Sequence, residues 1–402
     1  MESPNQHLLS IPVEILLKEG TMTVSTNSNN TLNNSNTGTD SELKLIQKKD
    51  YILALRKHLK EEELKPNKKE LIHYFIYMSI YCAGVYCIIS TQLVLPRIFI
   101  SIILGITLAS LLFFLHDLMH GAILKSKCAM YLTGFSVGLL IFFSPTFWQR
   151  IHNFHHAMTG NMMNDPDRMY IWNERPENLF EVFIYKMRIS NEAFHPLISL
   201  VSISTGFFWY FLFTIFYSFF PGRINPKKQN KYKSTHELFK IKDKLIVALE
   251  LLLIFLFQGF LFFIIANRDF LNYSLISLLP LAIAHAIAML YIHTNHFLSP
   301  LTGNVVDPLI NSLSIKNSKI VDKVFSNFSH HVEHHLFPSI SSSHYPKIRK
   351  LLIKLYPGRF QLMSMLDAIK SLFNTPIIYV DNTRLVTLDG KRKYNCLMPS
   401  TQ

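Results

Sequence analysis

Apolar stretches of membrane-crossing length are the feature that most constrains the fold of this chain. They occupy Leu71–Ser90, Ile98–Leu115, Leu197–Phe220, Leu245–Ile265 and Leu271–Ile292. A helix rises about 1.5 Å per residue, so roughly 20 apolar residues cross a hydrocarbon layer of about 30 Å. Backbone polar groups in that layer must be satisfied internally, which favours helices. We therefore expect an all-α integral membrane protein.

Composition supports this expectation. Hydrophobic residues make up 49% of the chain and charged residues only 17%, which is too apolar a balance for an ordinary soluble domain. The formal charge of +13 indicates cytoplasmic loops that face anionic lipid headgroups. The basic residues flank apolar stretches rather than lining one soluble face, so we expect no nucleic-acid partner.

The distribution of basic residues also predicts a topology. The segment 221–244 is strongly basic and should be cytoplasmic. Leu197–Phe220 must then enter and leave on that side or lie along the interface, although its length alone would support a full crossing. Ala129–Phe143 is short for a crossing and is expected to be re-entrant or interfacial. The other stretches give four transmembrane helices in two hairpins, with every histidine cluster in the cytoplasm.

Composition shifts divide the chain into four parts. Residues 1–41, with runs such as STNSNNTLNNSNTG, are expected to be a disordered tail without a cleaved signal peptide. Residues 42–69 are a charged, helical cytoplasmic segment interrupted by Pro66. Residues 70–360 are the membrane domain with its cytoplasmic helical cap, and residues 361–402 are a cytoplasmic tail. The segments HYPKIRKLLIKLY and SMLDAIKSLF carry helical patterning.

Eight of the 18 histidines fall in three clusters, HDLMH, HNFHH and HVEHH. Positions i, i+3 and i+4 of a helix share one face, so the imidazoles of each cluster can point at one site. The clustered histidines are His116, His120, His152, His155, His156, His331, His334 and His335.

Imidazole is a good ligand for iron, copper, zinc and nickel. A structural zinc ion takes four ligands, so this number of histidines favours a pair of metals. The four cysteines match no zinc or disulfide pattern. A membrane metal transporter is the rival hypothesis, but transporters place ionisable ligands along a path within the spans. Here the ligands lie at the ends of apolar stretches and in the cap.

The segments LHDLMHGAI, WQRIHNFHHAMTGNMMNDPDR, TNHFLSPLT and SNFSHHVEHHLFPSISSSHYPKIRKLL resemble the membrane-bound fatty-acid desaturases over roughly residues 70–360. The resemblance implies four spans, a cytoplasmic cap and two iron ions bound by three histidine boxes. It also implies that dioxygen and two electrons insert a double bond into an acyl chain. His116 and His120 match the first box, HNFHH the second and HVEHH the third. Hydroxylases of the same superfamily have similar boxes, so hydroxylation of a lipid or hydrocarbon is the nearest alternative.

The family uses a further histidine near the end of the last span, and His296 in TNHF is the best match here, with His293 as its competitor. His285 is too far along the helix to share a metal with His296, and we interpret it as a hydrogen-bonded residue within the bundle. His330 is interpreted as a solvated neighbour of the third box. The scattered histidines are interpreted as structural or surface residues: His7, His58, His73, His195, His236 and His344.

Metal-bound histidines usually donate their other N–H group to a carboxylate or carbonyl. Asp117 and Glu333 lie inside the boxes, and Asp165 and Asp167 follow the second box. These four are candidates for that supporting role, with exposed surface charges as the alternative. Asn295 is a candidate for holding a metal-bound water.

The resemblance also bears on partners. Three residues separate the histidines of the first box, a spacing closer to acyl-lipid than to acyl-CoA desaturases, so a lipid-linked acyl substrate is favoured. No HPGG haem-binding motif is present. Electrons should therefore come from an external donor, a ferredoxin or a cytochrome with its reductase, for which the basic cap offers a docking surface. The expected location is a bacterial inner membrane or the endoplasmic reticulum.

Overall fold

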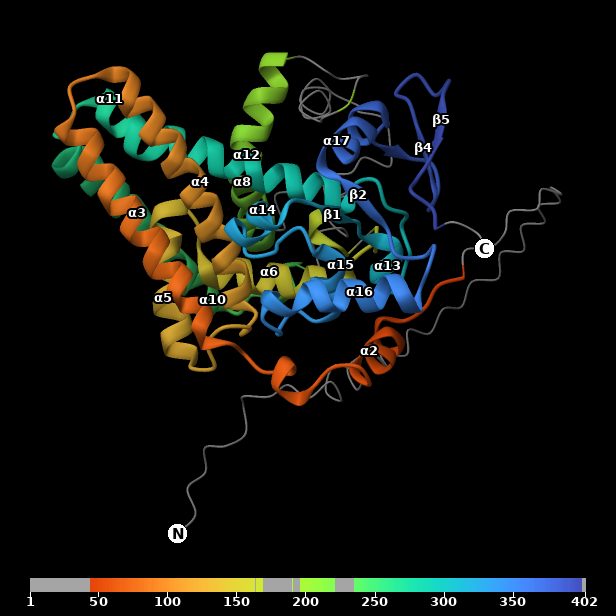
Figure 1. Cartoon of the computed structure of the whole chain (residues 1–402). Coiled ribbons are helices and arrows are strands. Elements are labelled where there is room, and N and C mark those ends of the chain that lie inside the picture. The colour runs from red at the N-terminus through yellow and green to blue at the C-terminus, as the bar shows by residue number, and fades with distance from the viewer. Residues whose placement is uncertain (1–43, 163, 169–189, 191–195, 221–234, 400–402) are drawn as a thin grey trace, which may run out of the picture. The chain divides into compact units, whose positions relative to one another are not determined.

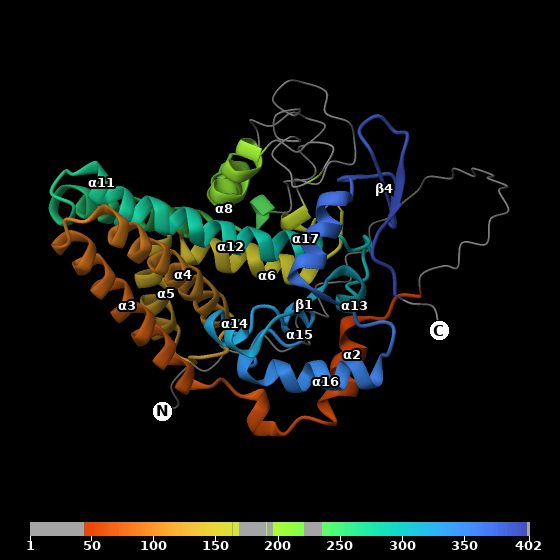
Figure 2. The same cartoon turned by 45° about the horizontal axis from the view of Figure 1, so that its top comes forward.

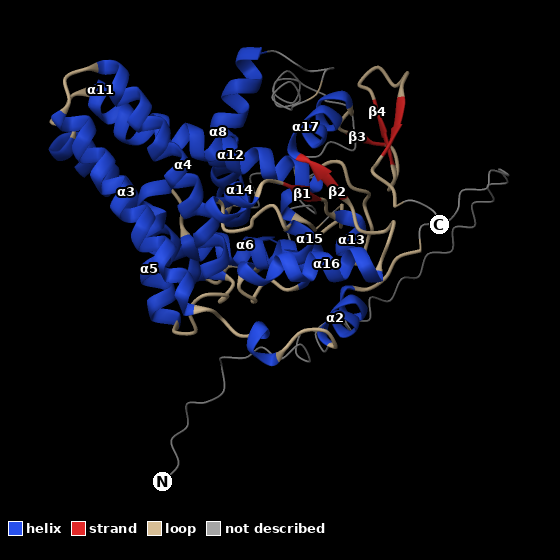
Figure 3. Ribbon diagram, in the orientation of Figure 1, coloured by secondary structure: helices blue, strands red, loops and turns tan. Residues whose placement is uncertain are grey.

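The computed structural model describes residues 44–399 except 163, 169–189, 191–195 and 221–234. The expected disordered tail 1–41, most of the basic segment and two scattered histidines, His7 and His195, lie outside the described residues. The described chain is mostly helical, with a few short strands (Figures 1 and 3).

Among the described residues, five helices are long and apolar enough to cross a membrane. They are α3 (Leu71–Ser90), α4 (Val94–Met119), α8 (Pro196–Phe219), α10 (Ile241–Phe260) with the π-helical turn Leu261–Ile265, and a last span. The last span joins α11 (Phe270–Tyr273), the π-helical turn Ser274–Leu278 and α12 (Leu279–His296). Large apolar side chains such as Phe75, Leu249 and Phe263 are exposed on these helices, a surface suited to lipid rather than water.

Helix α8 is the candidate span that was not among the four expected crossings. Its 24 residues form one continuous apolar helix, which meets the length and composition of a crossing. The expected count of four is therefore not confirmed, and the arrangement in two hairpins stays a prediction. The boundaries of the first stretch are correct, whereas α4 and α12 extend past the predicted ends to include His116 and His296.

Helix α12 packs against both α4 and α8, and α3 packs against α4 (Figure 1). The close approach of α4 and α12 depends on Gly105, because a Cβ atom there would overlap the side chain of Ile283. Small residues at such contacts allow helix backbones to approach within a membrane. The shared core includes Leu108, Phe207 and Ala284.

The segment expected to be re-entrant or interfacial, Ala129–Phe143, forms most of α5 (Lys127–Ile141). The next helix, α6 (Pro145–Met158), is bent by 99° from α5. Phe142 ends α5 in the left-handed conformation, and Ser144 caps α6 ahead of Pro145. The tight turn leaves no room for a Cβ atom at Gly138, which would overlap the carbonyl oxygen of Phe143. The bend turns α6 away from the direction of α5, as either a broken span or a re-entrant loop does.

The polar part of the chain covers the ends of α4, α6 and α12. It contains α2 (Lys48–Arg56), α13 (Pro308–Asn311), α14 (Lys319–Val324), α15 (His331–Leu336) and α16 (Tyr345–Leu355). Helices α2 and α16 lie side by side in Figures 1 and 2, and both contact α15. The buried face of α16 is formed by Tyr345, Ile348 and Leu352, at the spacing of an amphipathic helix. Pro66 lies between the short 3₁₀ turns Glu61–Leu64 and Lys68–Glu70, so the charged segment is interrupted as predicted.

The all-α expectation missed five short strands among the described residues. Strand β1 (Ser314–Lys316) pairs in parallel with β2 (Leu362–Ser364). Strands β3 (Ile378–Tyr379), β4 (Arg384–Val386) and β5 (Lys393–Asn395) form an antiparallel sheet after α17 (Met365–Asn374) (Figure 3). Strands of two or three residues leave no readable period in the sequence. The predicted tail 361–402 is thus folded where it is described, and its sheet contacts the loop that follows α12: Leu301 donates its backbone N–H to Asn382.

A buried ion pair links the residue before α13, Asp307, to Arg359 in the segment after α16. The carboxylate of Asp307 accepts hydrogen bonds from the guanidinium of Arg359, the Tyr51 hydroxyl at 3.0 Å and the Ile46 backbone N–H at 2.8 Å. Asp307 is fully buried, so its charge depends on these partners.

We expect Asp307→Ala to destabilise the cap by about 3–5 kcal/mol, because it leaves the Arg359 charge without its buried partner. A thermal unfolding curve of the purified protein in detergent measures this effect. The matched control is Glu62→Ala, which removes an ion pair with Lys60 in which both side chains are exposed, and should leave the melting temperature unchanged. Equal melting temperatures for the two variants would contradict the prediction.

Candidate metal centre

Histidines from four helices meet where the long helices end. His116 lies in the last turn of α4 and His120 caps it, while His152, His155 and His156 lie on α6. His296 ends α12, and α15 carries His331, His334 and His335. These segments are distant in sequence, so only the fold brings their imidazoles together.

The first group of ligands contains five histidines whose nearest ring nitrogens all lie within 4.8 Å of one another: His116, His120, His152, His156 and His334. Neighbouring Nε2 atoms are 3.0 Å apart between His116 and His152, 3.1 Å between His152 and His156, and 3.0 Å between His156 and His334. The Nε2 atom of His120 is buried without a hydrogen-bond partner in the described part of the chain.

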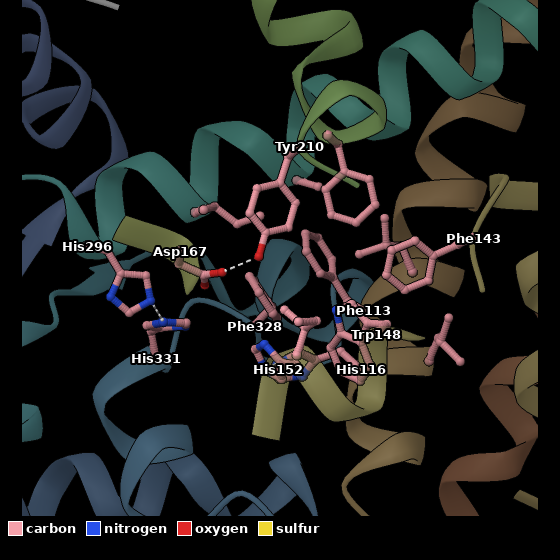
Figure 4. Close-up of a pocket in the computed structure, with 16 residues that line it drawn as sticks. Phe113, His116, Phe143, Trp148, His152, Asp167, Tyr210, His296, Phe328 and His331 are labelled. Atoms are coloured by element: carbon pink, nitrogen blue, oxygen red, sulfur yellow. Dashed lines mark hydrogen bonds between the residues drawn. The ribbon is translucent and has the colours of Figure 1, made fainter. Parts of the chain in front are cut away.

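The second group contains His155, His296 and His335, again with ligand atoms within 4.8 Å of one another. His331 joins it, because its Nε2 atom is 2.7 Å from that of His296 (Figure 4). The same atom is 3.0 Å from Nε2 of His335. The structure thus brings together all nine histidines expected as ligands, and it brings His296 rather than His293 to the second group.

These distances fit metal ligation. At a metal–nitrogen distance of about 2.1 Å, two ligands at right angles lie about 3.0 Å apart. Burial lowers the pKa of His334 and of His335 well below the ordinary value, so both rings are held neutral. The neutral ring is the form that binds a metal. Groups of five and four imidazoles are suited to holding two metal ions.

The structure corrects the expectation that each HxxHH cluster serves one site. In the second box, His152 and His156 join the first group and His155 joins the second. In the third box the division is reversed, because His331 and His335 face the second group and His334 faces the first. Positions i and i+4 are nearly aligned on a helix, whereas i+3 is rotated from i+4 by about 100°. Helices α6 and α15 therefore each supply ligands to both groups.

Of the predicted supporting carboxylates, Asp165 has the shortest bond to a ligand. Its Oδ1 atom is 2.7 Å from Nδ1 of His155, and both side chains are fully buried. Asp167 approaches the same nitrogen at 3.3 Å, and Asp117 lies 3.3 Å from Nδ1 of its neighbour His116. A carboxylate at Nδ1 orients the ring so that Nε2 faces the metal.

Glu333 differs from the expectation, whereas the expected role of Asn295 is not tested. Glu333 faces away from the rings of its own box and accepts hydrogen bonds from Arg349 at 2.5 Å and Ser314 at 2.6 Å. It supports the site indirectly, by attaching α15 to β1 and α16. The side-chain amide of Asn295 is fully buried, and neither its nitrogen nor its oxygen has a hydrogen-bond partner in the described part of the chain. Its role with a metal-bound water stays a prediction.

The other histidines lie outside both groups. His285 is 3.3 Å from the carbonyl oxygen of Ile141, as expected for a residue within the bundle. His293 stacks on Phe297, and Nδ1 of His330 is 3.1 Å from the Ser329 hydroxyl. His330, which precedes α15, is buried rather than solvated as expected.

Sequence reasoning missed three partners of ligand rings. The Tyr345 hydroxyl lies 3.0 Å from Nδ1 of His334, and the Thr159 hydroxyl lies 3.3 Å from Nδ1 of His335. The carbonyl oxygen of Asn311 is 3.5 Å from Nδ1 of His296. Hydroxyl and carbonyl groups are common everywhere in a chain, so the sequence offers no signal that would single out these three.

An apolar pocket opens between α4, α6, α8 and α12 and reaches both groups of histidines (Figure 4). His116 and His152 line it from the first group, and His296 and His331 from the second. The other lining residues are mainly apolar: Leu112, Phe113, Leu115, Phe143, Trp148, Ile151, Phe207, Ala288, Ile292 and Phe328, with Asp167 and Tyr210 as a hydrogen-bonded polar pair at 2.7 Å. The Trp148 ring stacks on His152 with centroids 4.4 Å apart.

The fold and the site define a membrane protein with a histidine-rich centre that could hold metal, at the end of an apolar pocket. Comparison with protein families gives its class: the fatty acid desaturase family model matches residues 93–366, more than half of the chain. The chain belongs to the fatty acid desaturase family, which confirms the resemblance found in the sequence. A comparison with curated proteins found no match.

We expect Asp165→Asn to weaken metal binding about 10–100-fold, because the neutral amide no longer fixes the His155 ring. The measurement is iron(II) retained by the purified protein during titration with a chelator. The control is Asp367→Asn, which changes an exposed carboxylate in the first turn of α17. Retention by the Asp165 variant equal to that of the control would show that the carboxylate has no role in metal binding.

Proposed function

We propose that this chain desaturates a fatty acyl chain at a pair of iron ions, with dioxygen as co-substrate. The observation that carries the proposal is the pocket: an apolar cavity whose lining includes histidines of both groups. An alkyl chain in this pocket would bring adjacent methylenes close to both groups at once. Membership of the family supports the same reaction class.

Bound iron would supply the oxidising chemistry, in which dioxygen takes up the two hydrogens of the acyl chain together with two electrons and two protons and is reduced to two waters. The protein's own contribution is to position and to exclude water. Phe113, Phe143 and Phe328 make the pocket walls apolar. Transfer from water into the pocket therefore lowers the free energy of an alkyl chain but not that of a polar group. Holding the acyl chain in one orientation against the histidine groups keeps the reacting methylenes in a geometry close to that of the reaction.

The two groups of histidines support two iron ions with the ligands named above, five for one and four for the other. Asp165, Asp167 and Asp117 would hold the outer nitrogens of His155 and His116. We further propose a lipid-linked acyl substrate, from the spacing of the first box, and an external electron donor. The boxes would face the cytoplasm, where a soluble donor can reach them.

Removal of one ligand tests the proposal. We expect His334→Ala to lose iron and all new unsaturation, because this ring belongs to the first group. The matched control is His330→Ala, four residues away and outside both groups, which should keep about two iron ions per chain and the product. Iron analysis of the purified proteins and gas chromatography of lipids from expressing cells provide the measurements.

Three outcomes would contradict the proposal. A hydroxylated lipid with no new double bond would assign the chain to the hydroxylases. Zinc in place of iron, without oxygen consumption on addition of reductant, would favour a transporter. Unchanged iron and unsaturation in the His334 variant would remove the first group from the metal site.

A further inference from the structure

A buried carboxylate lies in the middle of one candidate span. Glu250 belongs to α10, within the apolar segment Ile241–Ile265, and is only 1% exposed. An ionisable side chain at such depth is costly unless it is bonded, and it usually has a functional reason. The metal groups do not contain Glu250.

Both carboxylate oxygens of Glu250 accept hydrogen bonds from the start of α6. The donors are the Ser144 hydroxyl, the Thr146 hydroxyl at 2.5 Å and the Thr146 backbone N–H at 3.3 Å. The Ser144 hydroxyl oxygen in turn accepts the Phe147 backbone N–H at 3.2 Å, and Pro145 has no N–H to satisfy. The first turn of α6 is thus fully bonded, and the negative charge lies at the positive end of the helix dipole.

Other polar residues on the same face of α10 also hold the bent helix pair. Asp243, two turns before Glu250, forms an ion pair with Arg150 of α6 at 2.7 Å. Gln258, two turns after it, donates to the carbonyl oxygen of Leu139 in α5 at 3.2 Å. All three α10 side chains are buried. Residues seven or eight apart share one helical face, so α10 presents one polar stripe to α5 and α6.

Helix α6 supplies ligands to both groups of histidines and a wall of the pocket. His152 and His156 belong to the first group and His155 to the second, while Trp148 and Ile151 line the pocket. The depth and tilt of α6 therefore affect the distance and orientation of the acyl chain relative to the metal positions. A misplacement of about 1 Å, which is less than the length of one carbon–carbon bond of the acyl chain, can cost about 100-fold in rate.

We infer that Glu250 is a positioning residue of the reaction: from within the membrane it fixes α6, and so selects which methylenes face the metal centre. The inference rests on the proposed function for its chemical outcome. Its structural part, the position of α6 relative to the two metal groups, does not depend on the identity of the substrate.

The test compares Glu250→Leu, which removes both acceptors, with Glu250→Gln, which keeps one acceptor oxygen and loses the charge. Thr146→Val removes a single hydroxyl donor. The matched control is Glu237→Gln, an exposed carboxylate just before α10. Each purified protein is loaded with iron, and three quantities are measured: iron per chain, the Mössbauer spectrum of the loaded ferrous protein, and product formed per dioxygen with its positional isomers.

We expect the control to match the wild type. In Glu250→Leu, product per dioxygen should fall at least about tenfold and new positional isomers should appear, with Glu250→Gln and Thr146→Val shifted in the same direction by less. The Mössbauer spectrum should change in Glu250→Leu, because α6 supplies ligands to both metals.

The inference would be overturned if Glu250→Leu had the Mössbauer spectrum of the wild type, formed as much product per dioxygen and gave the same positional isomers. If that variant does not fold, wild-type coupling and isomers in both Glu250→Gln and Thr146→Val would overturn it. Failure of the proposed function looks different: the wild type itself then forms no double bond. The iron content and the spectrum would still report whether Glu250 positions α6.

Discussion

The convergence of nine imidazoles on two points is the constraint on which the rest of the structure depends. Neutral rings can lie with their Nε2 atoms about 3 Å apart because their outer nitrogens are held from behind. Asp165 holds His155, and Tyr345 holds His334. So many neutral ring nitrogens gathered in a buried site are costly unless something they can bind fills its centre. The geometry makes a metal the natural occupant.

The two HxxHH boxes join the groups into one centre. Each box gives its i and i+4 rings to one group and its i+3 ring to the other, so α6 and α15 fix the separation between the groups. Helix α15 is attached through Glu333 to Arg349 and Ser314. Helix α6 is attached through Arg150, Ser144 and Thr146 to the polar stripe of α10. The membrane helices and the cap thus hold opposite sides of the same site.

Sequence reasoning predicted the helices better than their arrangement. Apolar length located α3 to the residue, and amphipathic spacing located α16 and α17. The count of four crossings expected from the charge distribution is not confirmed, because α8 also has the length and composition of a crossing. Short strands such as β1 and β3 escaped because their pairing partners, not their own residues, define them.

The same division applies to the site. The boxes and the Asp residues after the second box were identified from spacing, and His296 from its resemblance to the family. Glu333 was misplaced because a carboxylate inside a box can turn to either face of a short helix. Thr159 and Tyr345 could not be identified, because hydroxyl groups are common throughout the chain. Glu250 is recognisable in the sequence as an ionisable residue within an apolar stretch, but its partner Ser144 is 106 positions away and no local pattern indicates it.

By itself, the sequence determined that the chain is a helical membrane protein of the desaturase family with three histidine boxes. The membrane helices and the grouping of the boxes follow from local patterns, the length of apolar runs and the periodicity of a helix, and the family follows from the resemblance of the box segments. The tertiary structure decided which rings share a metal position, which carboxylates support them and which helix holds α6. Those properties depend on distances between segments that are far apart in the chain, and no local pattern encodes such distances.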